Sequence, residues 1–558
     1  MKMVKSLFLG SAAGLLAMSG AQAADLPVKA APVEYVKICG LYGAGFFYIP
    51  GTDTCIKLGG YLRVDTTFNG SIYDQPAWSG DLGQQNRYRD YFAARSRMAL
   101  TVDTRTATEY GVVRTFAQAD FQFTTFNSNS LNPSSFITNA VGNGVSGLLG
   151  NVGEGYVAVE FVFLQFAGFT FGKSASAYAT PWHGYPGNNS SFLLGGHTTV
   201  TGIQNIQYSW QFGNGVSATL GVEDSVAFER TNIANLAFNT AANPFAGALS
   251  AVGGVGVGAY GGDHVPDIAG NIRVDQAWGL WQLSAASHVV NASYNSLSPG
   301  IVGGFVVPNN NSELSGHPTD KWGWAVMTAL QIKNIPLGAG DDIKMDASYS
   351  KGMTKQVIAT DSGSPSFAMF GGGSRLFVGN GGALLPSFGS VGFGTTTDAV
   401  FMPAFVPGFG FTGGTGDLKL TTAYGFRGAY NHNWDPYWSS SLFGSWSAVR
   451  YGGSEFDLTT AKGQYCLAYR RANGLVQGVN TSIDFSCNPN YDVSQLGVVT
   501  RWTPVKNLTF SAEVMLFHLN QNFSGAANLT PAAPKPIQVY EFKDQNTVAL
   551  NLRVQRNF

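Results

Sequence analysis

The chain has 558 residues, of which 44% are hydrophobic and 13% aromatic, but only 12% are charged, and its formal net charge is −1. Soluble globular domains carry about 25% charged residues, and nucleic-acid-binding chains carry a basic excess, so neither class fits. Low charge, 71 glycines and a mean hydropathy of +0.02 favour a β-barrel that spans a membrane.

The first 23 residues have the composition of a secretion signal. Lys2 and Lys5 precede a short apolar run over residues 7–18, and Ala21-Gln22-Ala23 supplies an A-x-A cleavage site. We predict a signal peptide over residues 1–23, which leaves residues 24–558 as one barrel domain. The apolar run is shorter than the ~20 residues of a spanning helix. An exported chain without such helices enters a membrane only as a closed barrel, so we expect an outer-membrane protein surrounded by lipid.

The four cysteines are Cys39, Cys55, Cys466 and Cys487. An oxidising compartment favours disulfides, and four cysteines allow three pairings. We favour Cys39–Cys55 and Cys466–Cys487 because each pair is close in sequence. A metal site is the rival interpretation, but no His or C-x-x-C spacing supports it, and we expect no cofactor.

Residues 57–68 alternate as a barrel strand does, because side chains point to opposite faces with period 2. One face is apolar and the other is polar, with the members Leu58, Leu62, Val64 and Phe68 against Lys57, Tyr61, Arg63 and Asp65. An apolar outer face and a polar inner face suit a wall between lipid and water.

Residues 34–65 read EYVKICGLYGAGFFYIPGTDTCIKLGGYLRVD. This run resembles the start of the mature porins of alphaproteobacterial outer membranes, of the Brucella and Rhizobiales type. The resemblance covers residues 33–66, extends loosely to the signal sequence and returns at the terminal strand. It implies a 16-stranded, trimeric all-β barrel that forms a passive diffusion pore, with long extracellular loops and one loop folded into the lumen.

The next strands are predicted over residues 91–103 and 110–123, joined by a short turn at residues 104–108. Their inward positions carry Arg95, Arg97, Asp103, Arg114 and Asp120. A polar loop follows to about residue 153. Residues 155–166 are apolar on both faces, so the pattern does not show which side chains point inward. We expect this strand to lie against another subunit or under a folded-in loop. Residues 168–174 resemble a phosphate loop, but they are one residue too short and alternate like a strand.

The same pattern of short turns and long loops repeats along the rest of the chain and gives sixteen strands, although 14 or 18 are not excluded. Long loops are predicted near residues 176–202, 229–264, 293–320, 353–417, 453–490 and 523–541. The loop at 353–417 is rich in Gly and Phe; it is either disordered or packed across the barrel mouth or a neighbour.

Residues 545–558 form the closing strand. Val548, Leu552 and Val554 share one face, and Asn551 and Arg553 the other. An open strand edge needs a partner, so we expect this strand to pair with residues 57–68. The family resemblance implies that the terminal Phe558 is read by the barrel-insertion machinery.

We predict a general diffusion porin for small hydrophilic solutes, with no enzymatic activity and no nucleic-acid partner. No nucleophile-elbow or zinc-protease motif occurs. The inward face has mixed charge, with Arg63, Arg95, Arg97, Arg114, Arg427, Arg501 and Arg553 beside Asp65, Asp103, Asp120 and Glu513. The alternatives are a substrate-specific channel, and an adhesin or structural barrel that carries no current.

The resemblance implies that residues 175–202 narrow the lumen, but this loop contains no Asp or Glu, whereas the family pattern supplies acidic residues there. We predict a constriction in which the wall opposite this loop supplies four arginines and three aspartates, namely Arg63, Arg95, Arg97, Arg114, Asp65, Asp103 and Asp120. The loop itself adds His183 and His197. An excess of arginine favours anions, more strongly as the histidines gain protons. The alternative is that other loops restore acidity and the pore is nearly unselective.

Overall fold

The computed structural model describes residues 37–70, 92–124, 155–190, 193–237, 259–295, 300–302, 305–307, 313, 315–358, 367–373, 375–406, 410–531 and 535–558. The predicted signal peptide and the polar loop predicted after residue 123 lie outside these ranges.

Sixteen antiparallel strands form a closed barrel, as predicted, and each strand pairs with the next along the chain. They are β2 (Cys55–Phe68), β3 (Phe92–Thr108), β4 (Gly111–Thr124), β5 (Tyr156–Phe166), β6 (Phe169–Ser174), β7 (Ile203–Gly213), β8 (Val216–Glu223), β10 (Asp267–Gln276), β11 (Gly279–Val290), β14 (Lys321–Lys333), β15 (Asp342–Lys351), β24 (Thr422–Asn433), β25 (Trp438–Arg450), β26 (Tyr491–Val505), β27 (Leu508–Gln521) and β30 (Gln545–Asn557).

The remaining described elements are short and lie in the loops or before the first barrel strand. They are η2 (Gly40–Tyr42), β1 (Phe47–Tyr48), β9 (Ile233–Asn235), β12 (Gly300–Val302), β13 (Phe305–Val307), η4 (Thr354–Gln356), β16 (Phe367–Gly372), β17 (Leu376–Val378), η5 (Asn380–Gly382), β18 (Leu384–Pro386), β19 (Gly389–Gly394), β20 (Ala399–Phe401), β21 (Phe405–Val406), β22 (Gly410–Phe411), β23 (Lys419–Leu420), α5 (Ala461–Ala472), β28 (Ala526–Leu529) and β29 (Gln538–Phe542).

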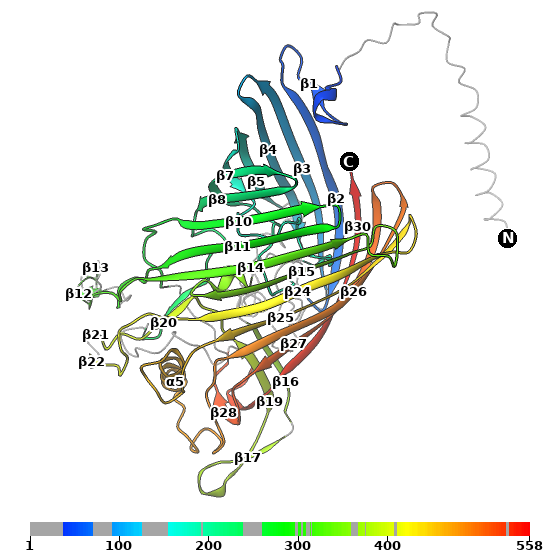
Figure 1. Ribbon diagram of the computed structural model, residues 1–558. Coiled ribbons are helices and arrows are strands. Elements are labelled where there is room, and N and C mark those ends of the chain that lie inside the picture. Colours follow the sequence, from blue (N-terminus) through cyan, green and yellow to red (C-terminus); the bar gives the residue numbers. More distant parts are fainter. Residues whose placement is uncertain are drawn as a thin grey trace, which may run out of the picture.

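The two ends of the chain close the barrel, as the terminal strand predicted. β30 pairs with β2 from Tyr61 opposite Asn557 to Phe68 opposite Leu550, and Figure 1 shows the red terminal strand beside the blue first strand. The backbone of Phe558 adds two hydrogen bonds to Gly60, at 3.1 and 3.2 Å. Gly60 has φ +148°, and a Cβ there would collide with the carbonyl oxygen of Ala99, so the seam depends on a glycine.

The alternation along the strands places apolar side chains outside and polar side chains inside. On β2 the outward Leu58 and Leu62 are 53% and 51% exposed, whereas Asp65 is 1% exposed. On β30 the outward Val548 is exposed, while Asn551 and Arg553 are buried. This arrangement is typical of a barrel with a polar interior and a lipid-facing belt.

The turn predicted at residues 104–108 is wrong. β3 continues to Thr108, and residues 109–110 make the turn to β4. Two interactions hold this end of β3 extended: Thr104 hydrogen-bonds to Thr115 on β4, and Arg105 pairs with Asp103 at 3.0 Å. The β-branched threonines favour the extended backbone.

The two apolar faces of β5 have a structural cause. The pairing of β4 with β5 shifts between Gln118 and Ala119, and such a bulge moves later side chains to the opposite face. Val157 and Val162 therefore both point outward and are exposed, while Phe161 between them is 7% exposed. Phe161 lies inside the barrel near the ring of His183, with centroids 6.3 Å apart. Of the two placements predicted for this strand, its inner face therefore lies under a folded-in loop.

The loops between β15 and β24, β25 and β26, and β27 and β30 pack into one lobe at the long-loop end of the barrel. β16, β19, β28 and β29 form a four-stranded sheet, and α5 adds its buried residues Tyr465 and Tyr469 to a large apolar cluster with Phe393 and Phe523. Figure 1 shows these elements gathered at the end away from β1. The described part of loop 353–417 is thus packed rather than disordered.

Both predicted disulfides are present. Cys39 bonds to Cys55 beside the start of β2, and Cys466 on α5 bonds to Cys487 in the same lobe. The second disulfide joins the helix to the segment that leads into β26. Each closes a short loop and restricts the unfolded chain.

Candidate pore constriction

The described residues between β6 and β7, 175–190 and 193–202, leave the wall after β6, contact the far wall across the inside of the barrel and return at β7. We call this segment the crossing loop. Its first residues are held by Glu223 at the end of β8, which accepts hydrogen bonds from Ser176 Oγ and the Ala177 amide, both at 2.8 Å. The loop therefore begins from a fixed point on the wall.

Its middle is held by a carboxylate on the far wall. Glu513 on β27 accepts hydrogen bonds from the backbone amides of Asn189 and Ser190. Asn189 Nδ2 donates to Ser511 Oγ on the same strand at 2.7 Å. A charged acceptor strengthens such bonds, so these contacts fix how far the loop reaches across the lumen.

Two wall arginines hold the carbonyl oxygens of the crossing loop. Arg427 on β24 donates to the carbonyls of Leu193 and His197 at 3.1 and 2.7 Å and pairs with Asp346 on β15 at 2.9 Å. Arg501 on β26 donates to the carbonyl of Gly187 at 2.5 Å. Both arginines point inward as predicted, and their charges support the loop.

A second segment, residues 353–358 after β15, docks on the crossing loop inside the barrel. The amide of Gly195 donates to the carbonyl of Val357 at 2.9 Å, and Gly196 forms a parallel bridge with Ile358. Lys355 is fully buried, with its ammonium 4.4 Å from the ring centre of Phe228. These contacts fill part of the lumen beside the crossing loop.

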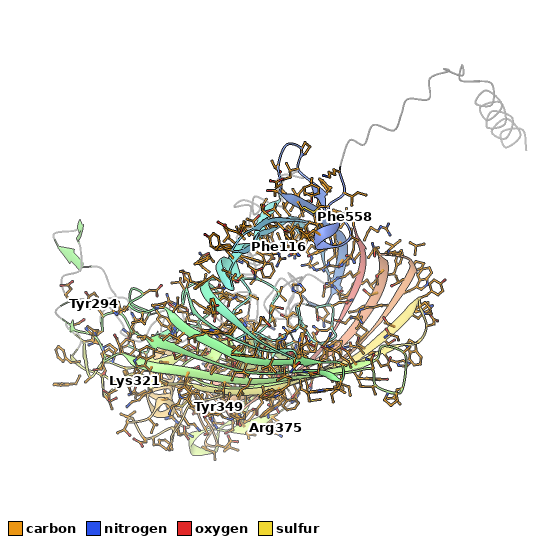
Figure 2. All side chains as sticks on the ribbon, turned by 45° about the horizontal axis from the view of Figure 1, so that its top comes forward. Phe116, Tyr294, Lys321, Tyr349, Arg375 and Phe558 are labelled. Carbon is orange, nitrogen blue, oxygen red and sulfur yellow. A yellow bond between two sulfur atoms is a disulfide. The ribbon has the colours of Figure 1, made fainter. Side chains whose placement is uncertain are left out.

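A cavity of about 460 Å³ remains between the crossing loop and the wall made by β2–β5 and β30. Its ionisable lining residues are Arg63, Arg97, Asp120, Glu160, His183 and Arg553, and its other polar residues include Tyr61, Gln118, Tyr156, Tyr185, Asn188 and Asn189. Three guanidinium groups thus face two carboxylates. Figure 2 looks partway into the barrel and shows the strands curving around its interior, with Phe558 on the rim.

The charged groups of the cavity differ in how they are paired. Arg97 forms an ion pair with Asp120 at 2.6 Å and lies 3.9 Å from Glu160. Arg63 donates from Nε to Gln555 Oε1 at 2.8 Å and forms no ion pair with any residue in the described ranges. Its guanidinium lies 4.5 Å from the ring centre of Tyr61, which orients it by a cation–π contact.

The structure brings only part of the predicted constriction together. Arg63, Arg97, Asp120 and His183 line the cavity. Arg95 and Asp65 form a buried pair at 2.7 Å, with side chains 1% exposed, and do not line it. Asp103 pairs with Arg114 at 3.0 Å nearer the short-turn end of β3 and β4.

His197 lies away from the cavity. Its ring is buried, with Nε2 3.3 Å from a Glu229 oxygen, between the rings of Tyr178 and Phe228. His183 does face the cavity, and burial together with the positive charge of Arg63 lowers the pKa of its imidazole below the ordinary 6.5.

The prediction omitted Arg553, Glu160 and Tyr156 from the constriction. The sequence predicts an inward Arg553 and the pairing of β30 with β2, but only the register of that pairing shows that Arg553 lies near Arg63. Glu160 and Tyr156 lie on β5, where the bulge obscures the alternation. Nothing in the local sequence of β5 marks the position of that bulge.

Two kinds of feature are absent from the described part of the chain. No helix in these ranges is long and apolar enough to cross a membrane. In the same ranges, no group of three or more His, Cys, Asp or Glu side chains is placed to hold a metal ion.

Residues 25–551 match the sequence profile of the porin subfamily. The chain belongs to this family. It is an outer-membrane β-barrel porin that forms a diffusion pore, a channel and not an enzyme. Porin Omp2b of Brucella neotomae is 29% identical over 382 residues, which are 66% of this chain and 93% of that porin. Porin Omp2b of Brucella abortus is 30% identical over 386 residues, 64% and 96% of the two chains.

Among solved structures, the barrel is similar to the outer membrane channel DcaP of Acinetobacter baumannii. The alignment covers 92% of this chain and 99% of that one, with 12% identity and a TM-score of 0.49. OmpT of Vibrio cholerae aligns over 91% of this chain and 100% of its own, with 7% identity and a TM-score of 0.38.

Proposed function

We propose that this porin passes small hydrophilic solutes and ions through the cavity beside the crossing loop, with a weak preference for anions. The observation that carries this proposal is the charge of the lining: Arg63, Arg97 and Arg553 against Asp120 and Glu160, facing a loop that contains no Asp or Glu. One positive charge is in excess when His183 is neutral. Glu223 and Glu513 are not part of this lining, and their oxygens accept hydrogen bonds from the crossing loop.

Fixed charges beside a narrow aqueous path produce potentials of several kT and raise the local concentration of the opposite ion. The preference should weaken in concentrated salt, because the Debye length falls to ~3 Å at 1 M. Arg63 and Arg553 should contribute most, since Arg97 is neutralised by Asp120 at 2.6 Å.

Reversal potentials of the purified porin in a planar bilayer under a salt gradient test the proposal. Anion preference is expected, and Arg63→Ala with Arg553→Ala should reduce it. Arg556→Ala is the matched control, because Arg556 is exposed on the outward face of β30. A cation-preferring or unselective native channel, or a double variant with an unchanged potential, would contradict the proposal.

We also infer a homotrimer. The support is the resemblance to trimeric porins and the run of exposed apolar side chains on the outer face of β5, including Val157, Val159, Val162 and Leu164. Mass measurement in mild detergent should give three chains per particle. A monomeric mass, with unboiled protein migrating as a single barrel on a gel, would contradict it.

Export should remove residues 1–23, so sequencing of the mature N-terminus should begin at Ala24. Retention of the first 23 residues in the assembled porin would contradict the proposed signal peptide. Assembly would then involve the barrel-insertion machinery and the surrounding outer-membrane lipids.

A further inference from the structure

Positive charge is unevenly compensated at the seam where β30 meets β2. Asp65 pairs with Arg95 at 2.7 Å and lies 3.5 Å from Arg553, so one carboxylate serves two guanidinium groups. Arg63 has no ion pair within the described ranges. Arg553 Nε has no hydrogen-bond partner in those ranges.

The nearby carboxylates offer no free hydrogen-bond acceptor to these two arginines. Glu513 on β27 adds negative charge near Arg553, but both of its oxygens already accept hydrogen bonds from the crossing-loop amides of Asn189 and Ser190. Asp120 is paired with Arg97 on the other side of the cavity. Two guanidinium groups thus face the cavity with capacity for an additional acceptor.

The strand register places these two groups close together. Arg63 lies opposite Gln555, and Asp65 lies opposite Arg553, so Arg63 and Arg553 are diagonal neighbours on the inner face, where such positions are about 7–8 Å apart. Both residues line the same cavity. Like charges at this spacing repel, and an anion between them would relieve the repulsion.

We propose that Arg63 and Arg553 form a binding subsite for the carboxylate group of a small monocarboxylate as it passes through the pore. This subsite rests on the proposed function, an anion-preferring pore. Small monocarboxylates would be the anions that bind most tightly in that pore. The planar fork of a guanidinium matches a carboxylate in geometry and donates two parallel hydrogen bonds. Cation–π contact with Tyr61 holds Arg63 in position for this.

The rest of the cavity selects against a second negative charge. Asp120 and Glu160 line it together with the two arginines, and they would repel a dianion such as hydrogen phosphate. Tyr185 and Phe228 offer ring surfaces to an uncharged remainder. A monocarboxylate with a compact, partly apolar body therefore fits better than a polyanion.

The test uses chloride current through single channels of the full-length porin, with benzoate, its neutral analogue benzamide, or inorganic phosphate added to one side. Benzoate should reduce the current in a saturable manner, and benzamide at equal concentration should not. Phosphate should act more weakly than benzoate.

The variant Arg63→Lys with Arg553→Lys separates the subsite from charge alone. It keeps both positive charges but removes the forks, so its reversal potential should stay close to native while the half-blocking benzoate concentration rises about tenfold. Arg556→Lys should change neither value. Migration of the unboiled Lys pair as the folded form on a detergent gel shows that the barrel has assembled.

Three results would overturn the subsite: current that falls without saturation, equal block by benzamide, or stronger block by phosphate. A Lys pair that binds benzoate as the native porin does would also overturn it. If the native channel prefers anions without benzoate block, the subsite is wrong and the anion preference stands. If the channel prefers cations, the proposed function itself is wrong.

Discussion

At the scale of single residues, burial decides what each luminal charge can do. The side chains of Arg95 and Asp65 are both 1% exposed and lie 2.7 Å apart, whereas Arg63 borders the cavity. Removing Arg95 would leave Asp65 with Arg553 at 3.5 Å as its remaining ion-pair partner, and breaking a buried pair costs up to about 3–5 kcal/mol. The same substitution beside the cavity changes the charge that a passing ion meets.

Arg95→Ala should therefore destabilise the barrel without changing ion preference. We expect the folded form to be lost at a lower temperature, measured by the shift between folded and unfolded bands on a detergent gel, with a native reversal potential. Arg105→Ala, at a side chain 29% exposed, is the control and should have a smaller effect on stability. A clear change in reversal potential for Arg95→Ala would show that this pair does reach the ion path.

His183 should make the anion preference depend on pH. Burial and the nearby Arg63 lower the pKa of its imidazole, so the ring is neutral at pH 7 and gains its charge only as the pH falls below the ordinary value of 6.5. Anion preference should rise over that acidic range, and His183→Gln should remove the rise. His197→Gln should leave the profile unchanged, because His197 lies away from the cavity; an equal loss with His197→Gln would contradict this assignment.

At the scale of elements, a neutral loop is held by a charged wall. The crossing loop supplies backbone amides and carbonyls, and the wall supplies Glu223, Glu513, Arg427 and Arg501 as their partners. The charges on the inward strands therefore have different roles. Some fix the loop, some face the cavity, and others, such as Arg95 with Asp65 and Arg114 with Asp103, pair within the wall.

Glu513→Ala should loosen the crossing loop. It leaves the half-buried amides of Asn189 and Ser190 without their carboxylate acceptor, and the cost lies below the about 1–3 kcal/mol of a fully buried unpaired group. We expect noisier single-channel current and a larger mean conductance than in the native porin. Glu109→Ala, at the exposed turn between β3 and β4, should behave as native. An unchanged current in Glu513→Ala would mean that the loop is fixed by other contacts.

The wall could be predicted from sequence because alternation with period 2 marks each strand and its two faces, as on β2 and β30. The bulge in β5 could not be predicted from sequence, because it depends on the pairing of β5 with β4. The extension of β3 to Thr108 was also missed, because it depends on contacts with β4 and between side chains of β3 itself. Of the residues predicted for the constriction, Arg63 and His183 line the cavity beside the crossing loop, whereas the pairing of Arg95 and the burial of His197 arise only from tertiary contacts.

At the scale of the whole molecule, the barrel closes through the last residue of the sequence. Phe558 exchanges two backbone hydrogen bonds with Gly60, and a Cβ on Gly60 would lie 3.2 Å from the Phe558 ring. The seam thus joins positions 498 apart in the chain. Its hydrogen bonds form only when both ends of the chain are in place.

Deleting Phe558 should reduce the amount of assembled barrel while export continues. The deletion removes both hydrogen bonds to Gly60 and the terminal ring from the seam. Quantification of folded porin in outer-membrane fractions, with unfolded chain measured in parallel, checks this. Asn557→Ala keeps the terminal residue and should assemble normally; native levels of the truncated chain would contradict the prediction.

The central claim is that ions pass through the cavity between the crossing loop and the β2–β5 wall. All four native cysteines are disulfide-bonded, so a Cys introduced at Gln118, which lines this cavity, would be the single free thiol. Tyr110→Cys, at a residue 73% exposed in the turn after β3, is the control.

Single-channel conductance in a planar bilayer before and after a bulky thiol reagent tests the claim most directly. We expect stepwise current in both variants, reduced by the reagent in Gln118→Cys and unchanged in Tyr110→Cys. Absence of current in the native porin, or a modified Gln118→Cys channel that conducts as before, would contradict it.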